Sequence, residues 1–255
     1  MNGRLWQAEC PPHHVIRATW WRRRFRLRSR GHRNAFHLPV CLLVSLAAVS
    51  YAEQVHPVTG RHIAPVMGMA GADWLVRPER VSEEEPDAAL DAIGIARGAT
   101  VADIGAGAGY FTWRLAVRVG PAGTVYANDI QPEMLDLLRK NIEGRHLANV
   151  EPVLGAEDDP RLPAGRVDLV LMVDVYHEFT EPQKMLRKMR ESLKADGRIV
   201  LLEYRKEDPN VPIRPEHKMS VSEVRAELEP EGFRFEKSLE TLPRQHILIF
   251  RKSVQ

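Results

Sequence analysis

The sequence predicts an α/β fold, doubly wound around a mostly parallel, seven-stranded sheet that ends in a C-terminal antiparallel hairpin. Apolar runs of strand length alternate five times with segments of helical periodicity, which is typical of right-handed βαβ crossovers. One run, VDLVLMVDV at 167–175, has the continuous apolar centre of a strand buried on both faces. Near the carboxyl end two strand-like runs follow each other directly, which indicates a hairpin.

The elements are expected in a regular order. A helix should begin near Val81, with Ser82 as its N-cap, acidic residues in its first turn and Pro86 close behind. Gly197 should end the predicted helix at 182–195. Strands are predicted at 100–106, 124–130, 150–154, 167–175, 198–204, 233–239 and 246–251, and crossover or flanking helices at 109–119, 132–146, 182–195 and 221–229.

Composition divides the chain into three parts: a basic leader and signal peptide (1–52), an irregular arm rich in Pro, Gly and His (53–80), and the α/β domain (81–255). Of 36 basic and 34 acidic side chains, the leader holds nine arginines and one acid, so 27 basic and 33 acidic remain. A body with this acidic excess does not favour a phosphate backbone, so no nucleic-acid partner is expected.

The leader ends in a 15-residue apolar run, LPVCLLVSLAAVSYA at 38–52. This run is shorter than the ~20 residues of a membrane-spanning helix, so no stable membrane span is expected. Its position after a cationic segment, with small residues at Ser50 and Ala52, predicts a signal peptide cleaved after Ala52 and an exported or periplasmic protein. The alternatives are a buried helix, or a cytoplasmic protein whose true start is Met67.

Both cysteines, Cys10 and Cys41, lie in the leader. The body therefore contains no disulfide, no cysteine nucleophile and no thiolate metal site. No metal site is expected, and nothing in the sequence predicts an oligomeric state.

A glycine run, VADIGAGAGYF at 101–111, follows the first predicted strand. A phosphate-binding P-loop needs Gly-Lys-Ser/Thr after its glycines, but Tyr110 follows the last glycine here. A dinucleotide G-x-G-x-x-G also fails, because its third glycine would fall on Tyr110 or Thr112. The pattern that fits is Asp-x-Gly-x-Gly-x-Gly, although a glycine run alone can be only a tight turn. Its members are Asp103, Gly105, Gly107 and Gly109.

With this motif in an alternating α/β chain, residues 80–255 resemble the class I S-adenosylmethionine-dependent methyltransferases. The resemblance implies a methyltransferase-type, Rossmann-like fold that binds S-adenosylmethionine, with the glycine loop beneath the methionine and ribose. It also implies that Asp129 binds both ribose hydroxyls and that Ile130 flanks the adenine. Asp129 alone does not discriminate, because a dehydrogenase places an acid there too and an aspartate can cap the helix that starts at Pro132.

Two further matches are looser. Family members often carry Gly-Asp-Ala-Glu after the third strand, with the aspartate at the adenine amino group; here Gly155 takes that position, and Asp158 or backbone near Ala156 is expected to replace it. The fourth strand ends in Asp-Val-Tyr-His-Glu, without the Asn/Asp-Pro-Pro-Tyr/Phe of many amino-directed enzymes. This resembles the small-molecule branch, which methylates quinones and related metabolites.

The expected function is therefore methyl transfer from S-adenosylmethionine to a small molecule, by in-line displacement at the sulfonium methyl. Asp174 and His177 are the catalytic candidates, because a base near neutrality would activate a hydroxyl or acidic carbon. His177 can also be explained as a hydrogen-bonded residue at a strand end. Glu203 and His217 are expected near the same pocket. Because this cofactor is made in the cytosol, export favours an alternative: a non-catalytic ligand-binding protein on the same fold.

Overall fold

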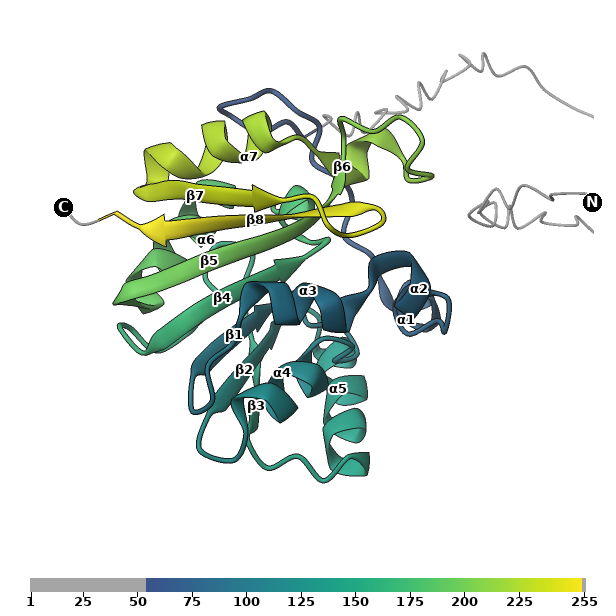
Figure 1. Ribbon diagram of the computed structural model, residues 1–255, viewed down its shortest axis with the longest axis vertical. Coiled ribbons are helices and arrows are strands. Elements are labelled where there is room, and N and C mark those ends of the chain that lie inside the picture. Colours follow the sequence, from purple (N-terminus) through teal and green to yellow (C-terminus); the bar gives the residue numbers. More distant parts are fainter. Residues whose placement is uncertain (1–53, 254–255) are drawn as a thin grey trace, which may run out of the picture. The chain divides into compact units, whose positions relative to one another are not determined.

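The computed structural model describes residues 54–253, and a single sheet forms the centre of this part of the chain (Figure 1). Its strand order is β3-β2-β1-β4-β5-β8-β7, and a short strand, β6, pairs with β5 beside this path. Strands β1 to β5 are parallel, β8 is antiparallel to β5, and β7 and β8 form the predicted hairpin. The fold class is confirmed, with one correction: the sheet has an eighth strand, β6, which the sequence did not predict. The predicted leader lies outside the described residues.

The strands are β1 (Thr100–Ile104), β2 (Thr124–Asp129), β3 (Val150–Leu154), β4 (Val167–Val173), β5 (Leu193–Arg205), β6 (Lys218–Met219), β7 (Phe233–Leu239) and β8 (Gln245–Lys252). The α-helices are α1 (Ala72–Leu75), α2 (Arg80–Glu84), α3 (Pro86–Ile93), α4 (Thr112–Val119), α5 (Pro132–Gly144), α6 (Pro182–Ser192) and α7 (Val221–Leu228). Four 3₁₀ turns, η1 (Met69–Gly71), η2 (Tyr176–Glu178), η3 (Pro215–His217) and η4 (Glu229–Glu231), complete the described elements. None of the helices within 54–253 has the length and apolarity to cross a bilayer.

Two apolar layers cover the sheet. Helices α3, α4 and α5 pack on one face, and α6 and α7 pack on the other. Because side chains alternate along a strand, β4 sends Leu169 and Leu171 to the first layer and Val170 and Met172 to the second. This explains the continuous apolar run in the sequence.

The helix predicted from Val81 is two helices, and Ser82 is not their cap. Helix α2 ends at Glu84, Glu85 adopts a left-handed conformation with φ 47°, and α3 begins at Pro86. Proline disfavours the helical conformation of the residue before it, which explains the break at Glu85. Ser82 lies inside α2, where its hydroxyl donates to the Glu79 carbonyl at 3.0 Å.

Gly197 does not stop α6, which already ends at Ser192. Leu193 instead opens β5 by pairing with Val167 of β4, and its side chain is buried in the second apolar layer. Lys194 Nζ binds Asp168 Oδ1 at 2.7 Å. Gly197 lies within β5, where an added Cβ would approach Leu193 to 3.0 Å. Tertiary pairing therefore starts this strand five residues before the predicted position.

Strand order sets the place where a ligand can bind. From β1 the sheet continues through β2 and β3 in one direction and through β4 and β5 in the other. In doubly wound sheets, ligands bind beyond the carboxyl ends of the strands at such a switch point. The segments that follow β1, β2 and β4 meet at this edge.

Candidate functional site

The glycine loop after β1 is held in conformations that favour glycine. Gly105, Gly107 and Gly109 have φ values of 68°, 52° and 86°. A Cβ on Gly105 would collide with Val175 beyond β4, and one on Gly107 would lie 3.1 Å from Leu75 Cδ1 of α1. Gly107 and Gly109 are buried, whereas Gly105 is exposed. Backbone conformation and close neighbours thus both require these glycines, and Gly105 is the part of the loop that a ligand can reach.

Asp129 ends β2 and connects it to this loop. Its Oδ2 accepts the backbone N–H of Gly107 and its Oδ1 that of Gln131, each at 2.9 Å. Burial raises the pKa of the Asp129 carboxyl, while these N–H groups lower it. A carboxylate has about four acceptor positions, so two remain for a vicinal diol. The next residue, Ile130, is partly exposed and available to a flat ring. These residues fit the ribose and adenine of S-adenosylmethionine.

Asp103 lies at the base of the loop. Its Oδ2 accepts the hydroxyl of Thr112, the first residue of α4, at 2.6 Å. Burial raises the pKa of Asp103 to about 7, while Thr112 and Arg80 act in the opposite direction. Asp103 therefore joins the end of β1 to the start of α4 and sets the shape of the loop.

The segment after β3 is fixed by Asn128. A Cβ on Gly155 would come 2.6 Å from Asn128 Nδ2, which also donates to the Pro160 carbonyl at 2.9 Å. Gly155, which stands where family members often carry the adenine-binding aspartate, therefore leaves room for the Asn128 side chain. Asp158 is exposed, and its predicted adenine contact stays a prediction.

The two catalytic candidates beyond β4 belong to different faces of the sheet. Asp174 has φ 49°, and its Oδ2 accepts Nε2 of Gln245 at 2.7 Å. Gln245 lies on the face of β8 that carries Ile247, in the layer of α3, α4 and α5. Burial raises the pKa of Asp174, and the charges of Glu84 and Glu203 add to this. Tyr176, next to His177, belongs to the opposite layer.

His177 is the centre of a buried polar cluster at this edge. Its Nδ1 lies 2.6 Å from Glu203 Oε2 of β5, and its Nε2 lies 3.1 Å from Nδ1 of His217 in η3. Glu203 Oε1 also accepts the Tyr176 N–H at 3.0 Å. Burial lowers the pKa of His177, but the carboxylates of Glu203 and Glu178 raise it by more. The structure thus brings together His177, Glu203 and His217, as the sequence predicted.

Glu178 is a candidate that sequence reasoning missed. It follows His177 in η2 and is 9% exposed. Burial, with the charge of Glu203, raises its pKa to about 7, although His177 lowers it. The only signal was its place in the motif, because burial of a charged side chain cannot be read from spacing.

The arm covers this edge of the sheet. The Arg61 guanidinium binds Glu227 of α7 through two hydrogen bonds, Nε to Oε1 at 2.9 Å and a second to Oε2 at 3.1 Å, and donates to the His177 carbonyl at 3.0 Å. Gln131 Nε2 donates to the Met67 carbonyl at 3.0 Å. Trp74 is 37% exposed. The arm, which the sequence predicts to be irregular, is therefore fixed both beside His177 and beside Gln131 at the start of α5.

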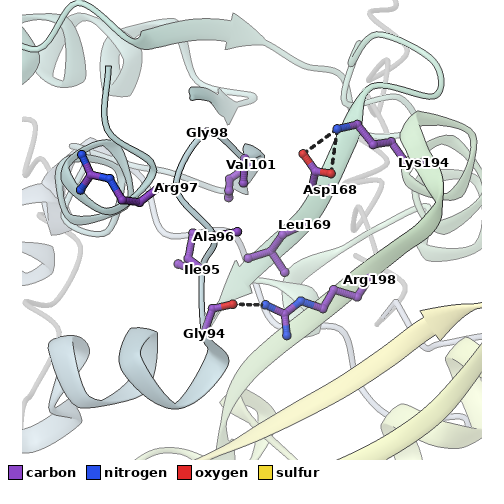
Figure 2. A pocket seen from close by; sticks show the side chains of 11 residues that line it. Gly94, Ile95, Ala96, Arg97, Gly98, Val101, Asp168, Leu169, Lys194 and Arg198 are labelled. Atoms are coloured by element: carbon purple, nitrogen blue, oxygen red, sulfur yellow. Dashed lines mark hydrogen bonds and ion pairs between the residues drawn. The ribbon is translucent and has the colours of Figure 1, made fainter. Parts of the chain in front are cut away.

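A separate hollow of about 330 Å³ lies at the opposite edge, between the segment before β1 and the starts of β4 and β5 (Figure 2). Three of its charged side chains are already paired: Lys194 binds Asp168, and Arg198 donates to the Gly94 carbonyl at 2.5 Å. It contains none of the residues predicted from the motifs. Ligands of this fold bind at the carboxyl ends of the strands, so we place the site there.

A glycine loop at the switch point, an acid ending β2 and a C-terminal hairpin together define a class I S-adenosylmethionine-dependent methyltransferase, and S-adenosylmethionine is its cofactor. The chain belongs to the family described as methyltransferase domain, whose model matches residues 95–238.

Known proteins agree with this assignment. The ubiquinone/menaquinone biosynthesis C-methyltransferase UbiE of Escherichia fergusonii is 32% identical over 118 residues, which are 46% of this chain and 47% of UbiE. The chain thus spans about half the length of the curated relatives it matches. A methyltransferase structure from Aquifex aeolicus aligns over 73% of this chain and all of its own, with 29% identity and a TM-score of 0.70. The [4+2]-cyclase SpnF shares the fold over 67% of this chain and 80% of its own, at 14% identity and a TM-score of 0.57.

Proposed function

We propose that this protein transfers the methyl group of S-adenosylmethionine to a small molecule that carries a hydroxyl group or an acidic carbon. The observation that carries the proposal is the contact between the glycine loop and the end of β4. Gly105 packs against Val175, and His177 follows two residues later. The cofactor edge and the buried histidine cluster therefore adjoin.

S-adenosylmethionine supplies an activated methyl group. In an in-line displacement, the acceptor oxygen or carbon would take the methyl group, the electron pair of the S–CH₃ bond would stay on sulfur, and the acceptor's proton would pass to Nε2 of His177 or to water. The chain's residues must then align the acceptor and exclude water. The arm, fixed by Arg61 and by the Met67–Gln131 contact, is suited to exclude water.

We assign acceptor activation to His177. The Glu203 carboxylate orients its ring and leaves Nε2 facing His217. Asp174 is better placed as a positioning residue, because its carboxylate is bound to Gln245 and lies 3.9 Å from a guanidinium nitrogen of Arg80. A hydroxylated ring is the preferred acceptor class, since the UbiE relatives act in quinone biosynthesis.

The test is methyl transfer from S-adenosylmethionine with an isotope-labelled methyl group to a panel of hydroquinones, phenols and enols. We expect a labelled product whose mass spectrum identifies carbon or oxygen as the acceptor atom. His177→Ala should lose at least tenfold in turnover with unchanged cofactor affinity by calorimetry, because we assign His177 to the acceptor and Asp129 to the cofactor. His146→Ala, which removes an exposed histidine, is the matched control. Cofactor binding without transfer to any acceptor would favour the non-catalytic alternative.

A further inference from the structure

Two 3₁₀ turns bring three potential metal ligands together at the carboxyl edge. Turn η2 follows β4 and carries His177 and Glu178; turn η3 precedes β6 and carries His217. One nitrogen or oxygen atom from each of these side chains lies within 4.8 Å of the others. Nε2 of His177 and Nδ1 of His217 are 3.1 Å apart, a separation that suits two nitrogens bound to one ion at about 2.0–2.1 Å each.

The other ring nitrogen of His177, Nδ1, has the kind of carboxylate partner that orients a metal-binding histidine. Glu203 is fully buried, and its Oε2 lies 2.6 Å from Nδ1 of His177. This contact places the proton on Nδ1 and leaves the Nε2 lone pair facing His217. Metal-binding histidines almost always have such a carboxylate or carbonyl partner on the other ring nitrogen.

The local charge also favours a cation. Glu178 and Glu203 are both buried beside His177. Arg61 lies near them, but its guanidinium is already paired with Glu227 and hydrogen-bonded to a backbone carbonyl. A bound cation would therefore offset carboxylate charge that the fold has removed from water.

We propose that Nε2 of His177, Nδ1 of His217 and a carboxylate oxygen of Glu178 bind one divalent transition-metal ion. Two imidazoles with one carboxylate suit Zn²⁺ or Fe²⁺, whereas Mg²⁺ and Ca²⁺ prefer oxygen ligands alone. The sequence predicts no metal site, but the lack of cysteine after residue 52 excludes only thiolate ligands and leaves histidine and carboxylate ligands possible.

Three protein ligands leave a coordination position open. If the proposed methyl transfer is correct, this position lies beside the acceptor and receives its hydroxyl or enol oxygen. The ion would lower the pKa of that oxygen, and the released proton would pass to water. His177 would then activate the acceptor through the ion.

The binding test uses the full chain, stripped of metal and titrated with Zn²⁺ against a chromophoric chelator. Residues 1–52 hold two cysteines and four histidines that can bind Zn²⁺ themselves, so the measured quantity is the difference between variants. Wild type should hold one more tight equivalent than His217→Ala, and His146→Ala should match wild type. Mg²⁺ should not compete. Glu203→Gln keeps all three ligands and should weaken binding by about 10–100-fold.

Equal Zn²⁺ stoichiometry in wild type and His217→Ala, both folded by circular dichroism, would overturn the metal site. The metal site and the proposed methyl transfer can fail independently of each other. Methyl transfer that is unaffected by metal removal, together with equal stoichiometry, would reject the metal site and keep the function. A tight site lost in His217→Ala, but no transfer to any acceptor with Zn²⁺ or Fe²⁺ present, would keep the metal site and reject the function.

Discussion

Oδ2 of Asp129 accepts the backbone N–H of Gly107 at 2.9 Å, which joins the end of β2 to the glycine loop after β1. The residue predicted to bind the cofactor's ribose therefore also holds the loop that is predicted to lie beneath the cofactor. Loss of this carboxylate affects both contacts at once, which makes it the most direct test of the cofactor site.

Asp129→Ala should weaken S-adenosylmethionine binding by roughly 1.5–3 kcal/mol, the scale of hydrogen bonds to a charged group. Calorimetric titration measures this change. Asp168→Ala is the matched control, because its carboxylate also accepts a backbone N–H, that of Thr100 at 2.8 Å, but at the opposite edge of the sheet. Equal affinities of wild type and Asp129→Ala would show that the ribose assignment is wrong, and binding of NAD in place of S-adenosylmethionine would contradict the family's cofactor.

Gly107→Val should abolish cofactor binding and leave the fold largely intact. A β-branched side chain resists the φ of 52° and would displace Leu75 of the arm. Gly165→Val carries a similar backbone penalty at φ 65°, with nothing within 4 Å of the added Cβ, and should bind the cofactor normally. If a Gly107→Val protein with a native circular dichroism spectrum binds the cofactor normally, the glycine run is only a tight turn and has no role in cofactor binding.

Stability should depend on pH through Asp103. Its pKa is raised from 3.8 to about 7, chiefly by burial, with Asp129 adding and Thr112 and Arg80 opposing. Between these two pKa values the folded state holds a proton that the unfolded state has released. The contribution of Asp103 to the free energy of unfolding is therefore fully present below about pH 4 and is lost as pH rises toward 7.

Asp103→Asn removes this titration and keeps an oxygen that can accept from Thr112. Urea unfolding of both proteins at several pH values should therefore show the free energy of unfolding of the variant rising relative to wild type between pH 4 and 7. The expected change is on the order of a few kcal/mol. A difference that stays constant with pH would mean that Asp103 is ionised in the folded protein.

Arg61→Ala should destabilise the fold by roughly 3 kcal/mol, because it leaves the buried Glu227 carboxylate without its guanidinium. Denaturant unfolding gives the value, and limited proteolysis should show earlier cleavage within the arm. Arg139→Ala breaks the exposed pair with Asp136 and should cost less than about 1 kcal/mol. Equal effects of the two substitutions would show that the arm is not held by this pair.

We propose that the protein is exported and begins near Glu53 after cleavage of the leader. The support is the nine-arginine leader, the 15-residue apolar run and the small residues at Ser50 and Ala52. Cell fractionation of the native host and sequencing of the mature amino terminus measure this directly. A cytosolic protein that starts at Met1 or Met67 would contradict the proposal. It would also remove the objection that an exported methyltransferase lies away from the cytosol, where its cofactor is made.

The sequence by itself determined the order of the main strands and crossover helices, the glycine loop and the acid that ends β2, but not the short strand β6. These features depend on short-range physics: alternation and helical periodicity of apolar residues, and the positive φ that favours glycine. The same local reasoning erred at Glu85 and Gly197, where the proline that follows Glu85 and the early pairing of Leu193 with β4 moved the boundaries.

Only the tertiary structure decided the partners of the polar side chains. Glu203 is 26 residues from His177, and His217 is 40 residues away, so their contacts depend on β4 and β5 being neighbours and on η3 folding back over them. Asp174 and His177, three residues apart in the sequence, separate to different faces because the chain turns through a left-handed conformation at Asp174. Such contacts depend on strand order and backbone direction, which residue spacing along one strand does not encode.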